Sequence, residues 1–394
     1  MLCLATEYPP ARGYGLGRYA REHCAALVRH GVAVDVACNN WDSEVDAYRE
    51  DGVSVHNAPL AVPFSGHTWV ADVLQHNVVL LGRCLEMMRA AGGYNLILAH
   101  DWLAAAAAAA LKALHRVPLV VAMHDTQRGK TAGQPDENEQ YIARVEEWIC
   151  EVADLVLANS HFIERELIQA YQVPPEKITV VGCGVRSEDF QTSADIEVFR
   201  TLFCARRERL VGFVGRLARV KGPDVLVQAV PAILSVCPDT QFVFAGDGSM
   251  RDGLLRQARE AGVAERVRLV GHLTGDVLAA FYHACDVIAI PSLYEPFGMV
   301  ALEAMAAGRP VIASATGGLK ETVLAGATGV AIPPRDPRAL ASAVVQLLMN
   351  PQAAASLGRQ AQERIATEFR WDDVATRTVR AWEHLATADG QGVR

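Results

Sequence analysis

The sequence predicts an α/β protein with two doubly wound domains, each built on a parallel β-sheet. Short apolar runs alternate with longer helical patterns along most of the 394 residues, which is typical of βαβ units. A polar, charged connection from about 186 to 208 interrupts this alternation. The length also suits two domains of ordinary size. We therefore predict an N-terminal domain over residues 1–190 and a C-terminal domain over residues 191–371.

The individual elements follow from the length and composition of each run. Short apolar, often β-branched runs predict buried parallel strands, and the longer runs between them predict helices. In the first half, strands are expected near 2–6, 32–38, 53–57, 95–99, 118–123, 154–158 and 178–181. Helices are expected near 16–30, 70–91, 102–115, 138–152 and 161–171. The second half predicts strands near 210–214, 241–245, 266–270, 286–290, 310–313 and 329–332, and then helix from about 337 to 386.

Composition narrows the class of protein. Apolar residues make up 51% of the chain, so a sizeable core is available, and the net charge of −8 argues against nucleic acid or an anionic membrane as a partner. The nine cysteines include no C-x-x-C pair, so we expect buried small hydrophobes in a reducing cytosol. An apolar strand opens the chain, and the longest apolar tract, Leu103 to Leu111, is too short to span a bilayer. We expect a soluble, cytoplasmic protein without a leader peptide.

The stretch from Pro291 to Glu321 carries the first candidate site. A buried strand, a loop with Pro296 and Gly298, and a helix ending before Gly308 are predicted in turn. Two glutamates eight positions apart would ordinarily be solvated, but these lie at the carboxyl edge of a parallel sheet, where such folds bind ligands. The helix N-terminus favours an anion, and glutamates beside it can hold hydroxyls, so a phosphorylated sugar fits. The glutamates are Glu295 and Glu303, and the amides belong to Phe297, Gly298, Met299 and Val300.

Other strand ends of the second half add positive charge and glycine. Arg216 and Lys221 follow the strand at 210–214 with glycines beside them. Together they can reach one diphosphate, and charge-assisted bonds contribute about 1.5–3 kcal/mol each. Gly246 ends the next strand, and Leu273 follows the strand after that, so both are expected at the same edge of the sheet.

The first half supplies a glycine loop and two histidines. Gly15 and Gly17, with Asp35 after the next strand, imitate a dinucleotide fingerprint, but the segment 7–12 separates them from the first strand. The alternative use is a glycine loop that contacts phosphate at a helix N-terminus. His100 and His124 end two successive predicted strands, so both are expected at the same sheet edge. Asp101, next to His100, is expected to cap the following helix.

Taken together, these motifs resemble the retaining glycosyltransferases of the GT-B fold, family GT4, with glycogen-synthase-like features. The resemblance rests on the E-x7-E pair, Gly-Arg followed by Lys-Gly, the glycine loop and the His-Asp-Trp triplet at 100–102. It implies two Rossmann-like domains facing across a cleft, with a last helix from about 372 that crosses back to the first domain. Relatives usually carry glycine where Tyr14 stands and asparagine where Cys183 stands; the tyrosine is expected to narrow or reshape that wall of the cleft, and Cys183 is a mild departure.

The resemblance also implies a role for each candidate residue. The substrate is a nucleotide-diphosphate sugar; Glu295, His124, Arg216 and Lys221 are the expected catalytic residues. Glu295 and His124 would lie by the transferred sugar, and Arg216 and Lys221 would neutralise the diphosphate. Donor-binding roles fall to Glu303 at the ribose, to His100 at the sugar, and to Gly15, Gly17, Gly246, Leu273 and the 297–300 segment. No Asp-x-Asp pair occurs in the chain, so neither a metal nor a cofactor is expected.

The expected reaction is hexosyl transfer, from UDP- or ADP-glucose to a saccharide or another hydroxyl acceptor. The triplet at 100–102 favours an α-glucan. A lipid acceptor is disfavoured because the helix near 70–91 carries only Arg83 and Arg89 as basic residues. Same-face attack assisted by the leaving phosphate is expected. Two alternatives stay open, namely a GT-B sugar-nucleotide epimerase and a non-catalytic nucleotide-sugar-binding protein.

Overall fold

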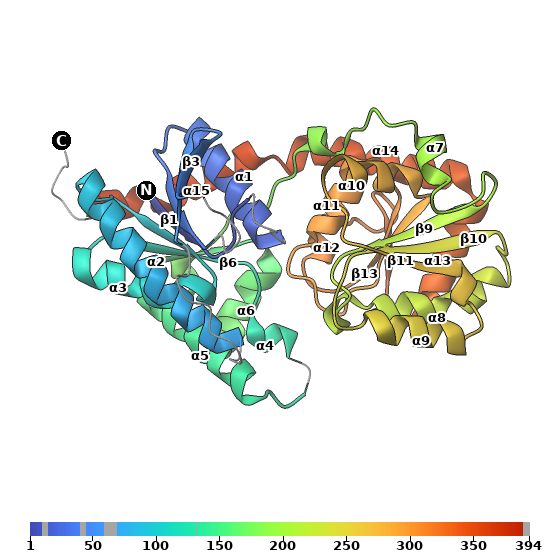
Figure 1. Ribbon diagram of the computed structural model, residues 1–394, viewed down its shortest axis with the longest axis horizontal. Helices are drawn as coiled ribbons and strands as arrows, with labels where there is room; N and C mark the ends of the chain where they lie inside the picture. Colours follow the sequence, from blue (N-terminus) through green and yellow to red (C-terminus); the bar gives the residue numbers. More distant parts are fainter. Residues whose placement is uncertain (10–14, 40–44, 59–68, 132, 389–394) are drawn as a thin grey trace. The chain divides into compact units, whose positions relative to one another are not determined.

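The computed structural model describes residues 1–9, 15–39, 45–58, 69–131 and 133–388 (Figure 1). The chain divides into two compact units. The N-terminal unit contains residues 1–184 and the chain from Trp371 onward, and the C-terminal unit is Val185–Arg370. The predicted boundaries lay at 190/191 and 371/372. The polar connection at 186–208 belongs to the C-terminal unit and holds a short helix, α7 (Ile196–Arg200).

The N-terminal unit is built on a sheet with the strand order β3-β4-β2-β1-β5-β6-β7-β8. Every pairing in it is parallel except that of β3 with β4. Because the order reverses at β1, the carboxyl ends of β1 and β5 flank a topological switch point. The strands are β1 (Leu2–Ala5), β2 (Asp35–Cys38), β3 (Ala47–Glu50), β4 (Val53–Asn57), β5 (Ile97–His100), β6 (Leu119–Met123), β7 (Leu155–Ala158) and β8 (Ile178–Val180).

Strand β3 was not predicted. Its sequence, AYRE, has no apolar run, because it forms the edge of the sheet and is half exposed. It pairs antiparallel with β4 through a tight turn in which Asp51 and Gly52 have φ angles of 49° and 80°. An Asp-Gly pair between two strands is a strong hairpin signal, so that dipeptide could have revealed the strand.

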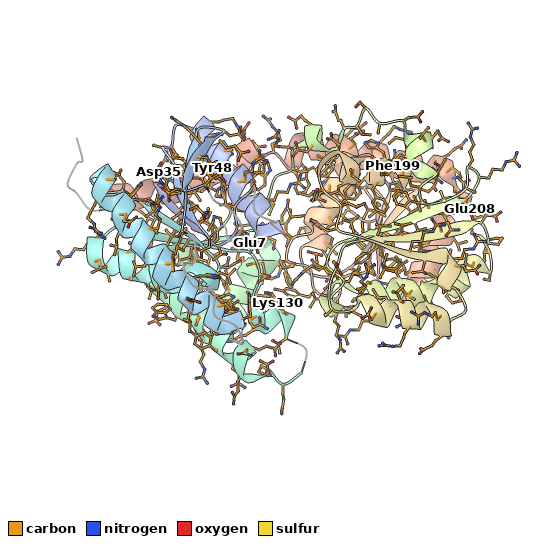
Figure 2. The ribbon with its side chains drawn as sticks, in the orientation of Figure 1. Glu7, Asp35, Tyr48, Lys130, Phe199 and Glu208 are labelled. Atoms are coloured by element: carbon orange, nitrogen blue, oxygen red, sulfur yellow. The ribbon has the colours of Figure 1, made fainter. Side chains whose placement is uncertain are left out.

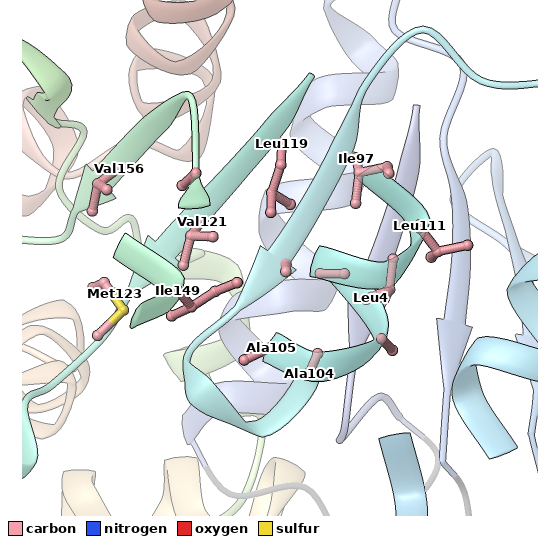
Figure 3. Close-up of a cluster of buried hydrophobic side chains, with 14 of the residues drawn as sticks. Leu4, Ile97, Ala104, Ala105, Leu111, Leu119, Val121, Met123, Ile149 and Val156 are labelled. Atoms are coloured by element: carbon pink, nitrogen blue, oxygen red, sulfur yellow. The ribbon is translucent and has the colours of Figure 1, made fainter. Parts of the chain in front are cut away.

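Helices cover both faces of this sheet. On one face, α1 (Gly15–Arg29) packs against α15 (Trp371–Ala388). On the other, α2 (Trp69–Ala91), α3 (Ala105–His115), α5 (Glu137–Val152) and α6 (His161–Tyr171) share a buried core with the strands. Figure 3 shows side chains of that core, including Leu4, Ile97, Val121 and Ile149. A short helix, α4 (Gln127–Lys130), follows β6.

The C-terminal unit is built on an entirely parallel sheet with the order β11-β10-β9-β12-β13-β14. This is the doubly wound order, with its switch point between β9 and β12, so a ligand site is expected at the carboxyl ends of those two strands. The strands are β9 (Arg209–Val214), β10 (Thr240–Ala245), β11 (Val267–Gly271), β12 (Val287–Ile290), β13 (Val311–Ser314) and β14 (Val330–Ile332). All the strands predicted from sequence in both halves are present.

Helices of the C-terminal unit also flank their sheet (Figure 1). They are α8 (Pro223–Leu234), α9 (Arg251–Glu260), α10 (Gly275–Ala284), α11 (Met299–Ala306), α12 (Leu319–Thr322), α13 (Pro337–Met349) and α14 (Pro351–Glu368). The helix predicted over 337–386 is therefore three helices. Asn350 ends the first and caps the second, its Oδ1 accepting from the amide of Ala353 at 3.1 Å, because Pro351 disfavours helical backbone in the residue before it. The second break lies where the chain passes between the units.

The cysteines behave as predicted. All nine are free thiols, and all but Cys237 are buried. Among the described residues, no helix combines the length and hydrophobicity needed to cross a membrane.

Candidate active site

An ion pair lies at the switch point of the C-terminal sheet. Lys221 follows β9, Glu295 follows β12, and the ammonium lies 2.8 Å from both carboxylate oxygens. Ser292 also donates to Oε2 of Glu295, at 3.0 Å. The Glu295 carboxylate is nearly buried, with 8% of its side chain exposed, whereas Lys221 keeps 23%. The three residues thus form a preorganised charged group at the edge where this fold binds ligands.

Two glycines hold the backbone of Glu295 in place. The amide of Gly318 donates to the carbonyl of Glu295 at 2.8 Å. Gly317 has a φ of +53°, and a Cβ there would lie 2.0 Å from the same carbonyl oxygen. Only glycine permits this approach. The contact of this Gly-Gly pair with residue 295 is visible only in the folded chain.

Glu303 lies inside α11, as predicted, and is nearly buried. Tyr282, on α10, donates its hydroxyl to Oε2 of Glu303 at 2.7 Å. This bond orients the carboxylate. Neither Ser292 nor Tyr282 was predicted, because an isolated serine or tyrosine carries no spacing signal.

The other predicted residues of the C-terminal unit lie at neighbouring strand ends. Gly298 precedes the first turn of α11, whose leading amides have no partner within the helix. Arg216 is exposed and has no carboxylate within 4 Å among the residues that the structure describes. Gly246 donates its amide to Gly271 at 2.7 Å. Leu273 follows β11 and is partly exposed.

In the N-terminal unit, the structure brings the two predicted histidines together. Nδ1 of His100 lies 2.8 Å from Nε2 of His124, and the rings are stacked. His100 is fully buried, whereas His124 is partly exposed. Burial lowers the pKa of His124 to about 4 and that of His100 well below its usual range, so both rings are neutral at pH 7. In this arrangement the partly exposed His124 can contact a ligand, and the buried His100 holds the His124 ring in position through their hydrogen bond.

The hydrogen-bond partners of His100 indicate which nitrogen carries the proton shared between Nδ1 of His100 and Nε2 of His124. Nε2 of His100 is buried without a partner in the described structure. An unpaired buried donor costs more than an unpaired acceptor, because backbone and side-chain donors are rarely left orphaned. The proton of His100 therefore belongs on Nδ1, which donates to His124. As a consequence, His124 carries its own proton on Nδ1 and presents a hydrogen-bond donor.

We expect replacement of His100 to change the tautomer of His124. In the wild type, nitrogen NMR should show neutral His124 protonated at Nδ1. His100→Leu removes the donor, so His124 should shift toward the Nε2-protonated form that a free imidazole favours. His100→Asn keeps an N–H at nearly the same place and should preserve the wild-type signal. An unchanged tautomer in the leucine variant would contradict the assignment.

Asp101 does not cap the helix that follows it, contrary to the prediction. Its carboxylate accepts instead from the amide of His124 at 2.7 Å, and its φ is +54°, which is rare for a residue other than glycine. Asn159 donates to the carbonyl of His124 at 2.8 Å. Both bonds fix the backbone that carries the histidine, so the unusual conformation of Asp101 serves the candidate site.

An aromatic cluster that sequence reasoning missed surrounds His124. The Tyr19 ring, on α1, lies 4.4 Å from the His124 ring and 5.1 Å from that of Trp371, which opens α15. His23 completes the cluster and lies 3.0 Å from the hydroxyl of Thr378. The cluster joins three distant segments of the chain, at 19–23, 124 and 371–378, so no local pattern could have predicted their contact.

The glycine loop of the first unit is only partly described. Gly15 opens α1 and is exposed, and Gly17 packs against Glu7, with a Cβ there expected at 3.2 Å from that side chain. Tyr14 and Gly13 lie outside the described residues. Cys183 is buried.

A buried carboxyl lies beside the loop that carries His124. Glu146 accepts from the amide of Gln127 at 2.9 Å and from the hydroxyl of Tyr171. Burial raises the pKa of Glu146 to about 7. In the same loop region, Lys130, which is labelled in Figure 2, pairs with Asp125 at 2.5 Å. The structure therefore holds an acid that is partly protonated near neutral pH.

Stability should depend on pH through Glu146. Its folded pKa, about 7, exceeds the ordinary value of 4.5. The stabilisation that the protonated carboxyl of Glu146 gives to the folded protein is therefore fully present below pH 4.5 and is lost as pH rises through 7. Glu146→Gln imitates the protonated form, so it should be nearly neutral at pH 5 and stabilising at pH 8, by at most about 3 kcal/mol. Urea unfolding at both pH values measures this, with the exposed Glu151→Gln on the same helix as control. Equal effects of Glu146→Gln at both values would contradict it.

Comparison with known proteins agrees with this architecture. Residues 197–364 match the family described as Glycosyl transferases group 1, and residues 14–189 match Glycosyltransferase Family 4. The chain is 33% identical over 408 residues to a glycogen synthase of Mycobacterium tuberculosis, covering 99% of this chain and 95% of that one. It is 32% identical over 397 residues to a D-inositol 3-phosphate glycosyltransferase of Corynebacterium jeikeium, covering 96% and 94%.

Solved structures show the same fold. A sucrose-phosphate synthase of Thermosynechococcus elongatus has a TM-score of 0.85 and 28% identity, covering 98% of this chain and 99% of that one. The catalytic domain of starch synthase IV of Arabidopsis thaliana has a TM-score of 0.78 and 17% identity, covering 98% and 99%. The protein therefore has the GT-B fold and is a glycosyltransferase. It belongs to the glycosyl transferases group 1 family, type GT4, and its relatives include glycogen synthases.

Proposed function

We propose that this glycosyltransferase moves a glucosyl group from a nucleotide-diphosphate sugar to a saccharide hydroxyl, with retention of configuration and without a metal ion. The observation that carries the proposal is the Lys221–Glu295–Ser292 group at the switch point of the C-terminal sheet. In this group, the ammonium of Lys221 can bind a phosphate, and the fixed carboxylate of Glu295 beside it can accept hydrogen bonds from sugar hydroxyls. The resemblance to GT4 enzymes supplies the role of each residue.

Charge neutralisation by the protein itself supports the metal-free part of the proposal. Lys221 and Arg216 both follow β9, and Arg216 has no competing carboxylate within 4 Å among the described residues. The leading amides of α11 add the partial positive charge of a helix N-terminus. Two cations and a helix N-terminus can offset the charge of a diphosphate, which is the task that divalent ions perform in other transferases.

The proposed step keeps the sugar on the same face. The bond from the anomeric carbon to the β-phosphate oxygen breaks, and its electron pair goes to the departing nucleotide diphosphate. The acceptor hydroxyl forms the new bond on that face and gives its proton to the departing phosphate oxygen. Lys221 and Arg216 stabilise the charge that develops on the leaving group. Glu295 stabilises the positive charge on the sugar ring, and Glu303 binds the ribose.

His124 completes the proposed roles on the N-terminal unit. The pairing with His100 leaves Nδ1–H as a donor, which suits a hydroxyl oxygen of the transferred sugar. His100 itself is fully buried, so we assign it to positioning His124 instead of the direct sugar contact that the sequence predicted. Relatives named glycogen synthase make an α-glucan the first acceptor to test.

A nucleotide-sugar screen tests the proposal. UDP-glucose or ADP-glucose should stabilise the protein against heat, and adding a soluble α-glucan should cause nucleotide release and an α-linked product. A chelator should leave the rate unchanged. Interconversion of the donor sugar without any acceptor would favour the epimerase alternative, and donor binding without release under any acceptor would favour a binding protein. Loss of activity with the chelator would contradict the metal-free mechanism.

A further inference from the structure

The C-terminal unit has a polar cavity of about 430 Å³ at the edge of its sheet opposite the candidate active site. It lies where β9, β12 and β13 begin, whereas Lys221 and Glu295 lie where β9 and β12 end. The end of α13 and the first turns of α14 supply an apolar wall. The polar side chains that line it are Arg209, His283, Asp286, Arg309, Arg359 and Gln362.

Positive charge in this cavity exceeds negative charge. Asp286 is the acid that lines it, and it is already paired with Arg200 at 2.7 Å and with Arg209 at 3.6 Å. Arg309 and Arg359 have no carboxylate within 4 Å among the residues the structure describes. Two unneutralised arginines in one cavity stand out on a chain with a net charge of −8.

Arg309 is the more informative of the two. It is partly buried, and within the described ranges its guanidinium hydrogen-bonds only to the carbonyl oxygens of Ala307 and His283, at 3.3 and 3.4 Å. Burial lowers the pKa of Arg309. A cation partly withdrawn from water without a directly bonded carboxylate costs free energy that a bound anion would recover.

Close backbone packing builds this arrangement. A Cβ at Gly358 would lie 2.2 Å from the carbonyl oxygen of Gly308, so α14 packs directly on the turn that precedes β13. Gln362, one turn further along α14, donates to the carbonyl of Ala306 at 3.0 Å. Arg309 and Arg359 each follow one of the two touching glycines, so this contact brings both arginines to the same cavity.

We propose that this cavity binds the phosphate group of a small phosphorylated metabolite. Guanidinium groups bind phosphate through paired, charge-assisted hydrogen bonds. The volume suits a ligand of sugar-phosphate size, and the apolar wall would pack on its carbon skeleton. The inference rests on the cavity alone and does not depend on the proposed glucosyl transfer.

Calorimetric titration tests the proposal, with ribose 5-phosphate, inorganic phosphate and unphosphorylated ribose as probes. The double variant Lys221→Met with Glu295→Gln serves as background, because it removes the ammonium group of the candidate active site without leaving an unpaired buried carboxylate. Ribose 5-phosphate should bind, inorganic phosphate more weakly and ribose not at all. Arg309→Gln and Arg359→Gln should each weaken binding by roughly 10- to 100-fold, as loss of a charge-assisted bond predicts. The exposed Arg259→Gln, on α9, should leave it unchanged.

The outcomes separate this site from the active site. If Arg359→Gln bound ribose 5-phosphate as tightly as its background does, the proposal would be overturned. Because Arg359 is exposed, this variant should fold normally. Failure of both phosphates to bind at millimolar concentration would also overturn it. Equal affinity for the two phosphates would refute the role of the apolar wall. Failure of the glucosyl-transfer assay would leave the binding result standing.

Discussion

Replacing Lys221 by methionine is expected to lower the turnover number by roughly 10²- to 10³-fold, the range seen when one preorganised charge-stabilising donor is lost. Lys221 Nζ lies 2.8 Å from both oxygens of Glu295. The same substitution should destabilise the C-terminal unit, because a buried pair that loses one partner leaves an uncompensated charge. Acceptor-dependent nucleotide release and urea unfolding measure the two effects.

A double replacement separates the catalytic effect from the structural one. In Lys221→Met with Glu295→Gln, no unpaired carboxylate remains, and the glutamine can still accept from Ser292. Stability should therefore recover relative to Lys221→Met, with a coupling of about 0.5–3 kcal/mol, while activity stays lost. Recovery of activity together with stability would show that the pair is structural and would contradict the proposed role.

Replacing Gly317 by alanine is expected to lower turnover by about 100-fold, the loss that a displacement of about 1 Å can cause at a reacting centre. The new Cβ would lie 2.0 Å from the Glu295 carbonyl oxygen, so the backbone carrying that carboxylate must move. The positive φ and the clash should together cost about 2–4 kcal/mol of stability. Steady-state kinetics and unfolding measurements on the same preparation test both numbers.

The matched control is Gly326→Ala. Gly326 also has a positive φ, +78°, but a Cβ there meets nothing within 4 Å. The Gly326→Ala variant should therefore lose stability because of the positive φ angle, but its turnover number should stay at the wild-type value. Equal kinetic losses in the two variants would mean that contact with Glu295 is not the cause.

Much of the candidate site could be predicted because its residues follow strands. The positions of Lys221 and Glu295 after β9 and β12 were readable from apolar runs and glycines alone, and parallel strands bring their carboxyl ends to one edge. Strand β3 escaped prediction because an edge strand needs no apolar run, even though its Asp51-Gly52 turn was visible. Asp101 was misread because a capping residue and a residue that binds a neighbouring strand's amide look alike in sequence.

The sequence by itself determined the alternation of strands and helices, the two-unit architecture and the residue types at each strand end, because these depend on local periodicity. Only the tertiary structure decided which of them touch. The ion pair of Lys221 with Glu295, the bond of Tyr282 to Glu303 and the stacking of His100 on His124 each join separate elements, and packing partly buries Arg309. Such contacts depend on how helices and strands pack and on what packing removes from water, and neither is encoded in spacing along the chain.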